Sequence, residues 1–169
     1  NGYNGQERNS FDYKTIYLMK DIDISNYKWT TLDYFNGTFN GLHHTINGLY
    51  INENMDRIAM IGHLEGVIKN IVLRNGEING NYYVAALCVE NEGLIENCGV
   101  SCNITSRKRS GILVAENRGL INNSYTVGQI YGTDFVGGSI GFNYGNGKIK
   151  NCYAAAVVKS SMMSNYIVT

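Results

Sequence analysis

Carboxylates are the side chains of this 169-residue chain with the most obvious capacity for catalysis or cation binding. Asp21 and Asp23 alternate with isoleucines, so in a strand both would lie on one face, where they could hold Ca²⁺ or form an acid–base pair. No further acid reinforces this pair from nearby segments, although Glu90, Glu96 and Glu116 recur later in the chain. We therefore predict no catalytic residue here and keep a carbohydrate-active enzyme as an alternative.

The three histidines do not form a metal signature. His43 and His44 are adjacent, so in a strand their side chains would point to opposite faces and could not easily share one ion. His63 stands alone, and the zinc-peptidase motif His-Glu-x-x-His is absent. The sequence therefore predicts no metal and no cofactor, and it predicts structural or surface roles for the histidines.

Tyrosines offer binding rather than catalysis, and the chain has thirteen of them. Tyr82, Tyr83, Tyr131 and Tyr144 fall in segments that we predict to be loops. Exposed aromatic rings on a rigid scaffold can stack on sugar rings or pack against a protein. These four tyrosines are therefore the predicted binding surface, and a host glycan or a protein is the expected partner.

The scaffold that positions these residues is a repeat. One motif occurs in four copies, the first shorter and the last longer than the others: residues 65–71, 90–98, 116–124 and 143–152. Each copy contains an isoleucine, and successive ones are 27, 26 and 28 residues apart: Ile68, Ile95, Ile121 and Ile149. A fixed period of this size indicates a repeat architecture.

Each repeat reads as short strands rather than as helix. No 11-residue window has a helical apolar stripe, and glycine interrupts every unit. One unit cannot bury its own apolar face, so successive units must stack. The predicted fold is all-β: a parallel β-helix, or β-solenoid, with about 26–28 residues per rung. Apolar residues on both alternation parities indicate two covered faces and leave open which parity points inward.

Stacking leads to specific expectations for the repeated positions. The four matching isoleucines should form one interior column. Two columns of asparagines should hydrogen-bond along the axis, unless they are solvent-exposed turn residues: Asn91, Asn117 and Asn143, and Asn70, Asn97, Asn123 and Asn151. Cys98 and Cys152 are two rungs apart, roughly 10 Å, which is beyond disulfide reach, so free and mostly buried thiols are expected.

The chain divides into a lead-in and a repeat region. Residues 1–35 are predicted as a lead-in strand and loop, with Ile22 and Ile24 facing inward and residues 26–34 forming the loop. Residues 36–169 are predicted as the solenoid, in a single domain that is a fragment of a larger protein. The rest of that parent chain is then an expected partner.

Composition excludes several classes of partner. Fourteen basic and 14 acidic residues give zero formal net charge, whereas nucleic acid or an anionic membrane would favour a basic excess. Apolar runs such as residues 154–158 are far too short to cross a bilayer. The sequence therefore predicts neither nucleic-acid binding nor membrane insertion.

Residues 111–125 and 137–153 resemble the GLUG-motif repeat of bacterial surface proteins, whose pattern is roughly G-G-L-V-G-x-N-x-G-x-I-x-N-C-Y. The lead-in looks like the segment that commonly precedes such repeats, and the resemblance covers roughly residues 15–158. Proteins with these repeats include adhesin-like surface proteins and IgA1-cleaving zinc metallopeptidases, where the repeats lie outside the catalytic domain. The resemblance implies an extracellular or cell-wall-attached location.

Our leading functional hypothesis is a non-catalytic β-solenoid module of a bacterial surface or secreted protein, acting as a rigid spacer and a surface for adhesion or binding. One alternative is an accessory module of a secreted IgA-type metallopeptidase. The other is a carbohydrate-active β-helix enzyme.

Overall fold

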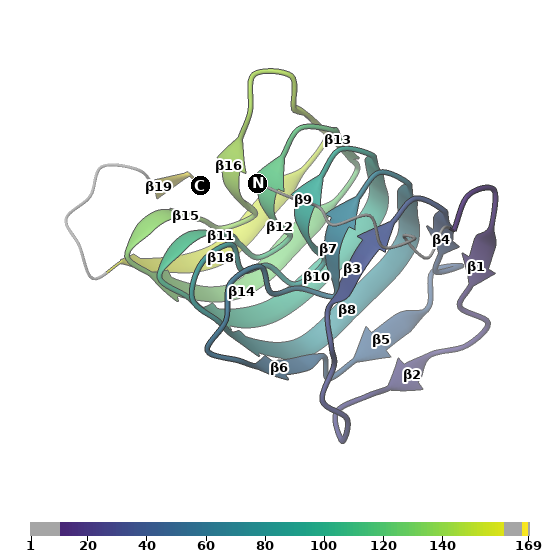
Figure 1. The fold of residues 1–169 in the computed structure, drawn as a ribbon, viewed down its shortest axis with the longest axis horizontal. Helices are drawn as coiled ribbons and strands as arrows, with labels where there is room; N and C mark the ends of the chain where they lie inside the picture. The colour runs from purple at the N-terminus through teal and green to yellow at the C-terminus, as the bar shows by residue number, and fades with distance from the viewer. Residues whose placement is uncertain (1–10, 161–166, 169) are drawn as a thin grey trace, which may run out of the picture.

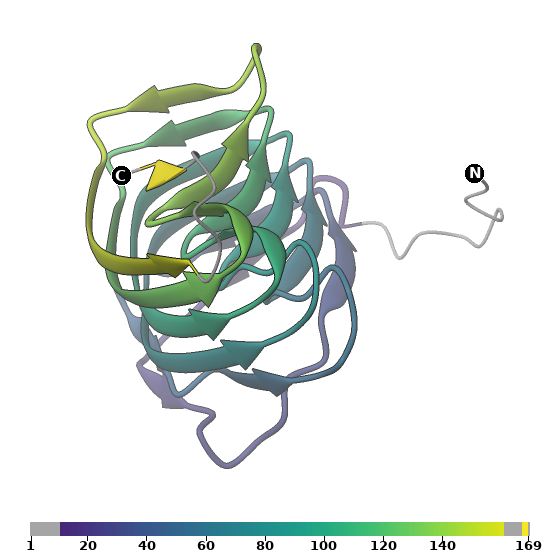
Figure 2. The same ribbon diagram turned by 90° about the vertical axis from the view of Figure 1, so that its left-hand side faces the viewer.

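The computed structural model describes residues 11–160 and 167–168. This part of the chain contains no helix, and its strands pair in parallel to form a β-solenoid of about five turns, which confirms the predicted fold class (Figure 1). The turned view shows successive turns lying one behind another (Figure 2). The predicted lead-in (1–35) and repeat region (36–169) include residues 1–10, 161–166 and 169, which lie outside the described residues.

The largest sheet has 11 strands and forms most of the wall of the coil. One hydrogen-bonded path through it consists of β1 (Thr15–Tyr17), β4 (Thr38–Asn40), β8 (Val67–Asn79), β10 (Leu94–Thr105), β13 (Leu120–Asn122) and β17 (Lys148–Lys150). The other members are β2 (Ile22–Asp23), β5 (Thr45–Asn47), β6 (Tyr50–Asn52), β14 (Tyr125–Gly132) and β18 (Tyr153–Ser160). The long strands β8 and β10 pass through a corner of the coil, so β8 pairs with β4, β5 and β6 in turn.

Two smaller sheets form other parts of the coil. The five-stranded sheet contains β3 (Leu32–Phe35), β7 (Ile61–Leu64), β9 (Cys88–Asn91), β12 (Val114–Asn117) and β16 (Ile140–Asn143). The three-stranded sheet contains β11 (Lys108–Gly111), β15 (Asp134–Gly137) and β19 (Ile167–Val168). β15 and β16 approach each other so closely that a Cβ on Gly137 would lie 1.8 Å from the carbonyl oxygen of Ile140. Only glycine fits there.

The predicted isoleucine column is present, with one correction. Ile95 pairs in register with Ile68 and Ile121, and Ile121 pairs with Ile149. The first three members are fully buried, whereas Ile149 is 46% exposed. Its place in β17, at the end of the strand path, leaves it with a neighbour on only one side. The expectation that all four isoleucines are interior was therefore wrong for Ile149.

The first asparagine column forms a hydrogen-bonded ladder, as predicted. Asn91 Nδ2 donates to Asn117 Oδ1 at 2.7 Å, and Asn117 Nδ2 donates to Asn143 Oδ1 at 2.7 Å. Asn91 and Asn117 are fully buried, so these bonds satisfy amides that would otherwise be costly to bury. The ladder ends at Asn91 because the register partner on the other side is Leu64, and Asn91 Oδ1 has no hydrogen-bond partner.

The second asparagine column serves a different purpose from the one predicted. All four members have a positive φ of 47–55°, which places them in the left-handed region at the corners of the coil: Asn70, Asn97, Asn123 and Asn151. Asparagine tolerates this conformation better than other side chains do. Asn97 Nδ2 donates to Asn70 at 3.0 Å, but Asn151 donates to Asn122 rather than to Asn123. The expected continuous ladder is therefore wrong for the later turns.

The lead-in strands pair directly with the following turn: β1 with β4, β2 with β5 and β3 with β7. Ile22 and Ile24 pack against the core while Asp21 and Asp23 are exposed, as predicted. The predicted loop at residues 26–34 is too long, because strand β3 begins at Leu32. Trp29 stabilises the preceding segment by donating its Nε1 hydrogen to the carbonyl of Met60 at 3.0 Å.

All four cysteines are free, as predicted, and Cys88, Cys98 and Cys102 are buried. Burial disfavours the thiolate and raises the pKa of Cys98 and of Cys102 to about 12. The sequence left open which alternation parity of the strand residues points inward, and the structure shows that residues of both parities are buried. The main core takes most apolar side chains, and a second cluster, covered by Tyr83, contains Ala59, Ala85, Val89 and Ala115.

Candidate functional site

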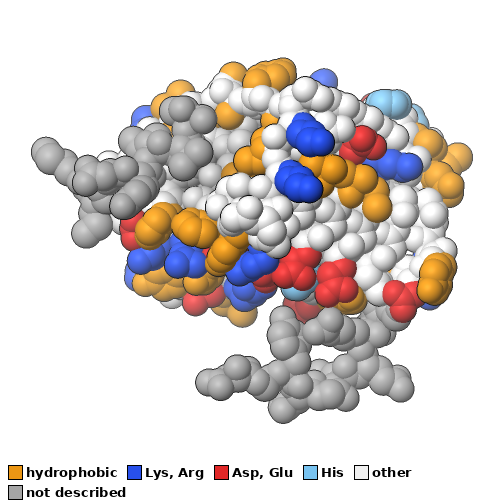
Figure 3. Space-filling view, turned by 90° about the horizontal axis from the view of Figure 1, so that it is seen from above, with side chains coloured by type: hydrophobic (Ala, Val, Ile, Leu, Met, Phe, Trp, Pro, Cys, Tyr) orange, Lys and Arg blue, Asp and Glu red, His pale blue; other side chains and the backbone are white. Residues whose placement is uncertain are grey.

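One face of the five-stranded sheet concentrates the charged side chains. Five side chains occupy in-register positions on β3, β7, β9, β12 and β16: Tyr34, His63, Glu90, Glu116 and Phe142. In the space-filling view, basic side chains lie next to acidic ones over this region, with a histidine beside them (Figure 3). We call these five residues, together with the two flanking columns described next, the charged face.

The first flanking column has unusual backbone geometry. Its four members are 26 residues apart, and all have a φ between 50° and 61°: Arg57, Tyr83, Arg109 and Phe135. Large side chains are rare in the left-handed region, which costs roughly 1–2 kcal/mol per residue. Such conformations persist only where the surrounding structure enforces them, and they cluster at functional sites.

The second flanking column comes from the turns that follow β7, β9, β12 and β16, and it contains Glu65, Glu92, Arg118 and Tyr144. Backbone hydrogen bonds to the preceding turn fix all four of these positions, and Glu65 N donates to Phe35 O at 3.0 Å. Glu92 N donates to Leu64 O at 2.8 Å, and Arg118 N donates to Asn91 O at 2.8 Å. Tyr144 N donates to Asn117 O at 2.9 Å. The three columns therefore form a grid that the stacking holds in place.

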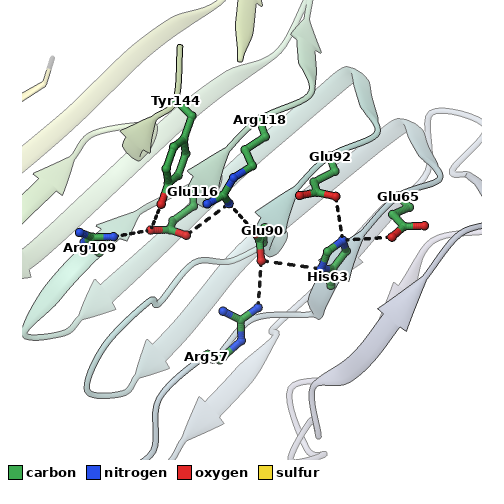
Figure 4. Close-up of polar contacts among 9 residues, drawn as sticks. All are labelled: Arg57, His63, Glu65, Glu90, Glu92, Arg109, Glu116, Arg118 and Tyr144. Carbon is green, nitrogen blue, oxygen red and sulfur yellow. Dashed lines mark hydrogen bonds and ion pairs between the residues drawn. The ribbon is translucent and has the colours of Figure 1, made fainter. Parts of the chain in front are cut away.

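The half of the charged face near β12 and β16 combines guanidinium groups with aromatic rings, and Figure 4 shows Arg109, Arg118 and the Tyr144 ring around Glu116. Glu116 accepts hydrogen bonds from Arg109 Nη1 at 2.8 Å and from the Tyr144 hydroxyl at 3.1 Å. The bond to Glu116 raises the pKa of Arg109. The Arg118 guanidinium lies 3.6 Å from the centre of the Tyr144 ring, a cation–π contact.

Arg109 also lies over three aromatic rings, with its guanidinium carbon 5.4–5.7 Å from each ring centre: Tyr83, Phe135 and Phe142. These contacts order a large aromatic surface beside two cations. Such a surface can recognise a ring-shaped or anionic group by stacking and charge.

The other half of the charged face surrounds His63 with carboxylates (Figure 4). Its Nε2 lies 3.5 Å from Glu65 Oε1 and 3.5 Å from Glu92 Oε2. Its Nδ1 lies 3.7 Å from Glu90 Oε2, and Glu90 also forms ion pairs with Arg57 and Arg118. Among the described residues, His63, Glu65 and Glu92 are the group whose ligand atoms, all within 4.8 Å of one another, could hold a metal ion.

Sequence reasoning missed the surroundings of His63. The histidine stands alone in the sequence because two of its three carboxylates, Glu90 and Glu92, come from the next turn. A signal was nevertheless present, since adding the repeat length of 27 residues to positions 63 and 65 gives positions 90 and 92. Aligning the turns would have placed these residues together.

The four predicted binding tyrosines separate into two groups. Tyr83 and Tyr144 both belong to the charged face, where Arg109 and Arg118 contact their rings. Tyr82 and Tyr131 are exposed but form no part of that face. Tyr131 also corrects the predicted loop, because it lies in strand β14 and pairs in register with Thr105 and Lys159.

Asp21 and Asp23 are exposed and already hydrogen-bonded. Asp21 Oδ1 accepts from Thr45 N at 2.9 Å and lies 3.0 Å from His44 Nδ1, and these contacts lower the pKa of Asp21. Asp23 accepts from Ser25 N at 2.8 Å, and its hydrogen bonds with Ser25 likewise lower its pKa. A general acid needs a raised pKa, so neither carboxyl is suited to that role.

Comparison with known proteins finds a similar sequence for only part of the chain. No protein-family model matches it, and no solved structure matches it. It is 33% identical over 85 residues to halomucin from Haloquadratum walsbyi. That match takes in 48% of this chain and 1% of halomucin, so the chain spans a very small part of this relative. The described residues contain no helix that is long and apolar enough to cross a membrane. The chain is thus a parallel β-solenoid with a stretch similar to part of halomucin.

Proposed function

We propose that this chain is a non-catalytic module of a larger surface or secreted protein. Its stacked turns form a rigid spacer, and its charged face is a binding surface for a glycan or a protein. The resemblance to the GLUG repeat and the partial similarity to halomucin support this location.

The observation that carries the proposal is the grid of side chains on the charged face. Stacking repeats three positions from turn to turn at about 4.8 Å, and backbone conformation, ion pairs and cation–π contacts hold the side chains that occupy them. A pre-ordered array of aromatic and charged groups loses little entropy when it binds a partner. A rigid rod that presents such an array suits adhesion.

The arrangement of carboxylates favours binding over glycan hydrolysis. Glycosidases need one carboxyl group with a raised pKa to act as the general acid. On the charged face, Glu116 is held by Arg109 and Arg118, and Glu90 by Arg57 and Arg118. Both carboxylates are therefore engaged in ion pairs with guanidinium groups, an arrangement that suits a binding surface.

The experiment compares two double variants in binding to immobilised oligosaccharides and purified extracellular proteins. Tyr83→Ala with Tyr144→Ala removes both tyrosines of the charged face, and we expect at least a tenfold loss of affinity for the ligand that the native chain binds. Tyr82→Ala with Tyr131→Ala is the matched control, because it removes two exposed tyrosines outside that face. This control should bind like the native chain.

Two results would contradict the proposal. Equal losses in both double variants would show that the charged face is not the binding surface. Release of new reducing ends from any oligosaccharide by the native chain, lost on Glu116→Gln substitution, would show an enzyme.

A further inference from the structure

His63, Glu65 and Glu92 are arranged with the spacing of metal ligands. Zinc bonds nitrogen and oxygen ligands at about 2.0–2.2 Å, so two ligands at tetrahedral positions lie about 3.3–3.5 Å apart. The distance from His63 Nε2 to each of the two facing carboxylate oxygens is 3.5 Å. These separations are longer than a good hydrogen bond but match the edge of a coordination tetrahedron.

His63 Nε2 is itself an unsatisfied buried atom. It is inaccessible to solvent and has no hydrogen-bond partner, although it faces two carboxylates. A buried nitrogen without a partner is costly, and a bound ion is one of the recognised explanations. A metal ion between His63, Glu65 and Glu92 would satisfy it.

The balance of charges around His63 also favours a bound cation. Glu90 is neutralised by Arg57 and Arg118, but the ion pairs that Glu65 and Glu92 form within the described part of the chain are with His63 alone. Two carboxylates therefore share one imidazole, which leaves net negative charge even if the ring is protonated. A divalent cation would neutralise both.

Neighbouring groups lie against the ligand side chains on the side away from the site. Glu90 Oε2 faces His63 Nδ1 at 3.7 Å, so Nδ1 is directed toward a carboxylate and Nε2 toward the site. The Tyr34 hydroxyl donates to Glu65 Oε2 at 2.5 Å, which leaves Glu65 Oε1 toward His63. A histidine whose second nitrogen faces a carboxylate is a recurrent feature of zinc sites.

We propose that His63, Glu65 and Glu92 bind a divalent transition-metal ion of the zinc type, joining the turns that contain β7 and β9. Imidazole with two carboxylates suits Zn²⁺ and its neighbours in the transition series rather than Ca²⁺ or Mg²⁺, which prefer oxygen ligands alone. Three protein ligands leave one tetrahedral position for water or for a donor from a partner. This site stands independently of the adhesion role.

The test is calorimetric titration of the untagged, chelator-treated chain with Zn²⁺, followed by Co²⁺ absorption spectroscopy. We expect one ion per chain, an intense Co²⁺ band typical of tetrahedral geometry, and a higher melting temperature with Zn²⁺ because the ion binds only the folded state. Mg²⁺ and Ca²⁺ at the same concentrations should not compete. Binding of Ca²⁺ or Mg²⁺ in preference to Zn²⁺ would overturn the assignment.

Single substitutions test whether the ion binds at these residues. Glu92→Gln and Glu65→Gln each change one ligand on a partly exposed side chain, so folding should be retained while Zn²⁺ affinity falls at least ~100-fold. Tyr34→Phe removes only the hydroxyl that orients Glu65, and we expect a loss of roughly 10-fold. Unchanged affinity in either glutamine variant, or absence of stoichiometric Zn²⁺ binding to the native chain, would refute the proposal.

Other ligands in the chain provide the controls. Cys152 is half-buried, and His44 faces Asp21, so both could bind Zn²⁺ adventitiously. Cys152→Ser and His44→Ala should therefore leave the affinity and the Co²⁺ spectrum unchanged. Loss of binding in either control would place the ion elsewhere and contradict the site.

Discussion

The interior isoleucine column and the strand column of the charged face are built on the same stacking register but differ in content. Ile68, Ile95 and Ile121 repeat one side chain in successive turns. The matching turns of the charged face instead carry His63, Glu90 and Glu116. In the isoleucine column one shape is repeated, and each turn packs on an identical neighbour. The face does not repeat in this way, and its chemistry changes from turn to turn.

Electrostatics limits how far the face can repeat one charged side chain. Glu90 and Glu116 are register neighbours, and like charges at strand spacing repel. Arg118 bridges this pair through ion pairs to both carboxylates. Isoleucines stacked at the same spacing attract one another, so the interior column tolerates exact repetition, whereas the repeated carboxylates of the face need a cation between them.

The largest expected effect separates a buried isoleucine from the exposed one. Ile95→Ala should destabilise the fold by about 2–5 kcal/mol, because it leaves a cavity between Ile68 and Ile121. Ile149→Ala is the matched control, and it should cost less than about 1 kcal/mol because its side chain is half-exposed. Urea unfolding followed by circular dichroism measures both. Similar losses would mean that position in the stack does not govern burial.

The two asparagine columns should respond differently to the same change. Asn117→Ala leaves the buried Asn91 Nδ2 without its acceptor, at an expected cost of about 1–3 kcal/mol. Asn123 is exposed and left-handed, so Asn123→Gly should change stability by less than about 0.5 kcal/mol, since glycine adopts that conformation freely. Chemical denaturation distinguishes these outcomes. A costly Asn123→Gly would show that its side chain, rather than its backbone, matters.

A smaller effect is expected from the ion pairs of the charged face. Glu116 is only 6% exposed, and Glu116→Gln weakens its contacts with Arg109 and Arg118, at about 1–2 kcal/mol. The solvent-exposed pair of Lys28 and Glu53 provides the comparison, and Glu53→Gln should cost less than about 0.5 kcal/mol. Equal effects in the two variants would mean that the charged face is no better organised than ordinary surface.

Thiol labelling distinguishes the buried cysteines from the more accessible one, and the raised pKa of the buried thiols is not expected to lower the stability of the fold at neutral pH. Iodoacetamide at pH ~8 should label Cys152 in the folded chain and all four cysteines in urea, because burial suppresses the other thiolates. The pKa of Cys98 rises from 9.0 to about 12 on folding, so its contribution to stability is complete below pH 9 and is lost between pH 9 and 12. Mass spectrometry and unfolding across this range test both points. Rapid labelling of folded Cys98 would contradict its burial.

What could be predicted from the sequence follows from the repetition itself. The isoleucine register and the Asn91–Asn117–Asn143 ladder were predictable because identical residues recur at a fixed period. Exposure of Ile149 was not, because repetition gives no information about which turn lies at an end of the stack. The break in the second ladder depends on side-chain choices among neighbouring asparagines, which spacing does not determine.

The candidate site was less predictable because its members differ in type. Arg57, Tyr83, Arg109 and Phe135 share a backbone conformation but alternate between arginine and an aromatic residue, so no single repeated residue marks the column. Of this face, only Tyr83 and Tyr144 were expected to bind, on the ground of predicted exposure. The ligand set of His63 arises from neighbouring turns, and it becomes visible only when their register is known.

Crystals grown with Zn²⁺ and measured at the zinc absorption edge would test the central claim most directly, that a repetitive interior positions an irregular functional face. The account predicts one anomalous peak about 2.0–2.2 Å from His63 Nε2 and from oxygens of Glu65 and Glu92. It also predicts Ile95 buried between Ile68 and Ile121 in parallel, stacked turns. Antiparallel pairing of these strands, or a zinc-loaded crystal without a peak at His63, would contradict it.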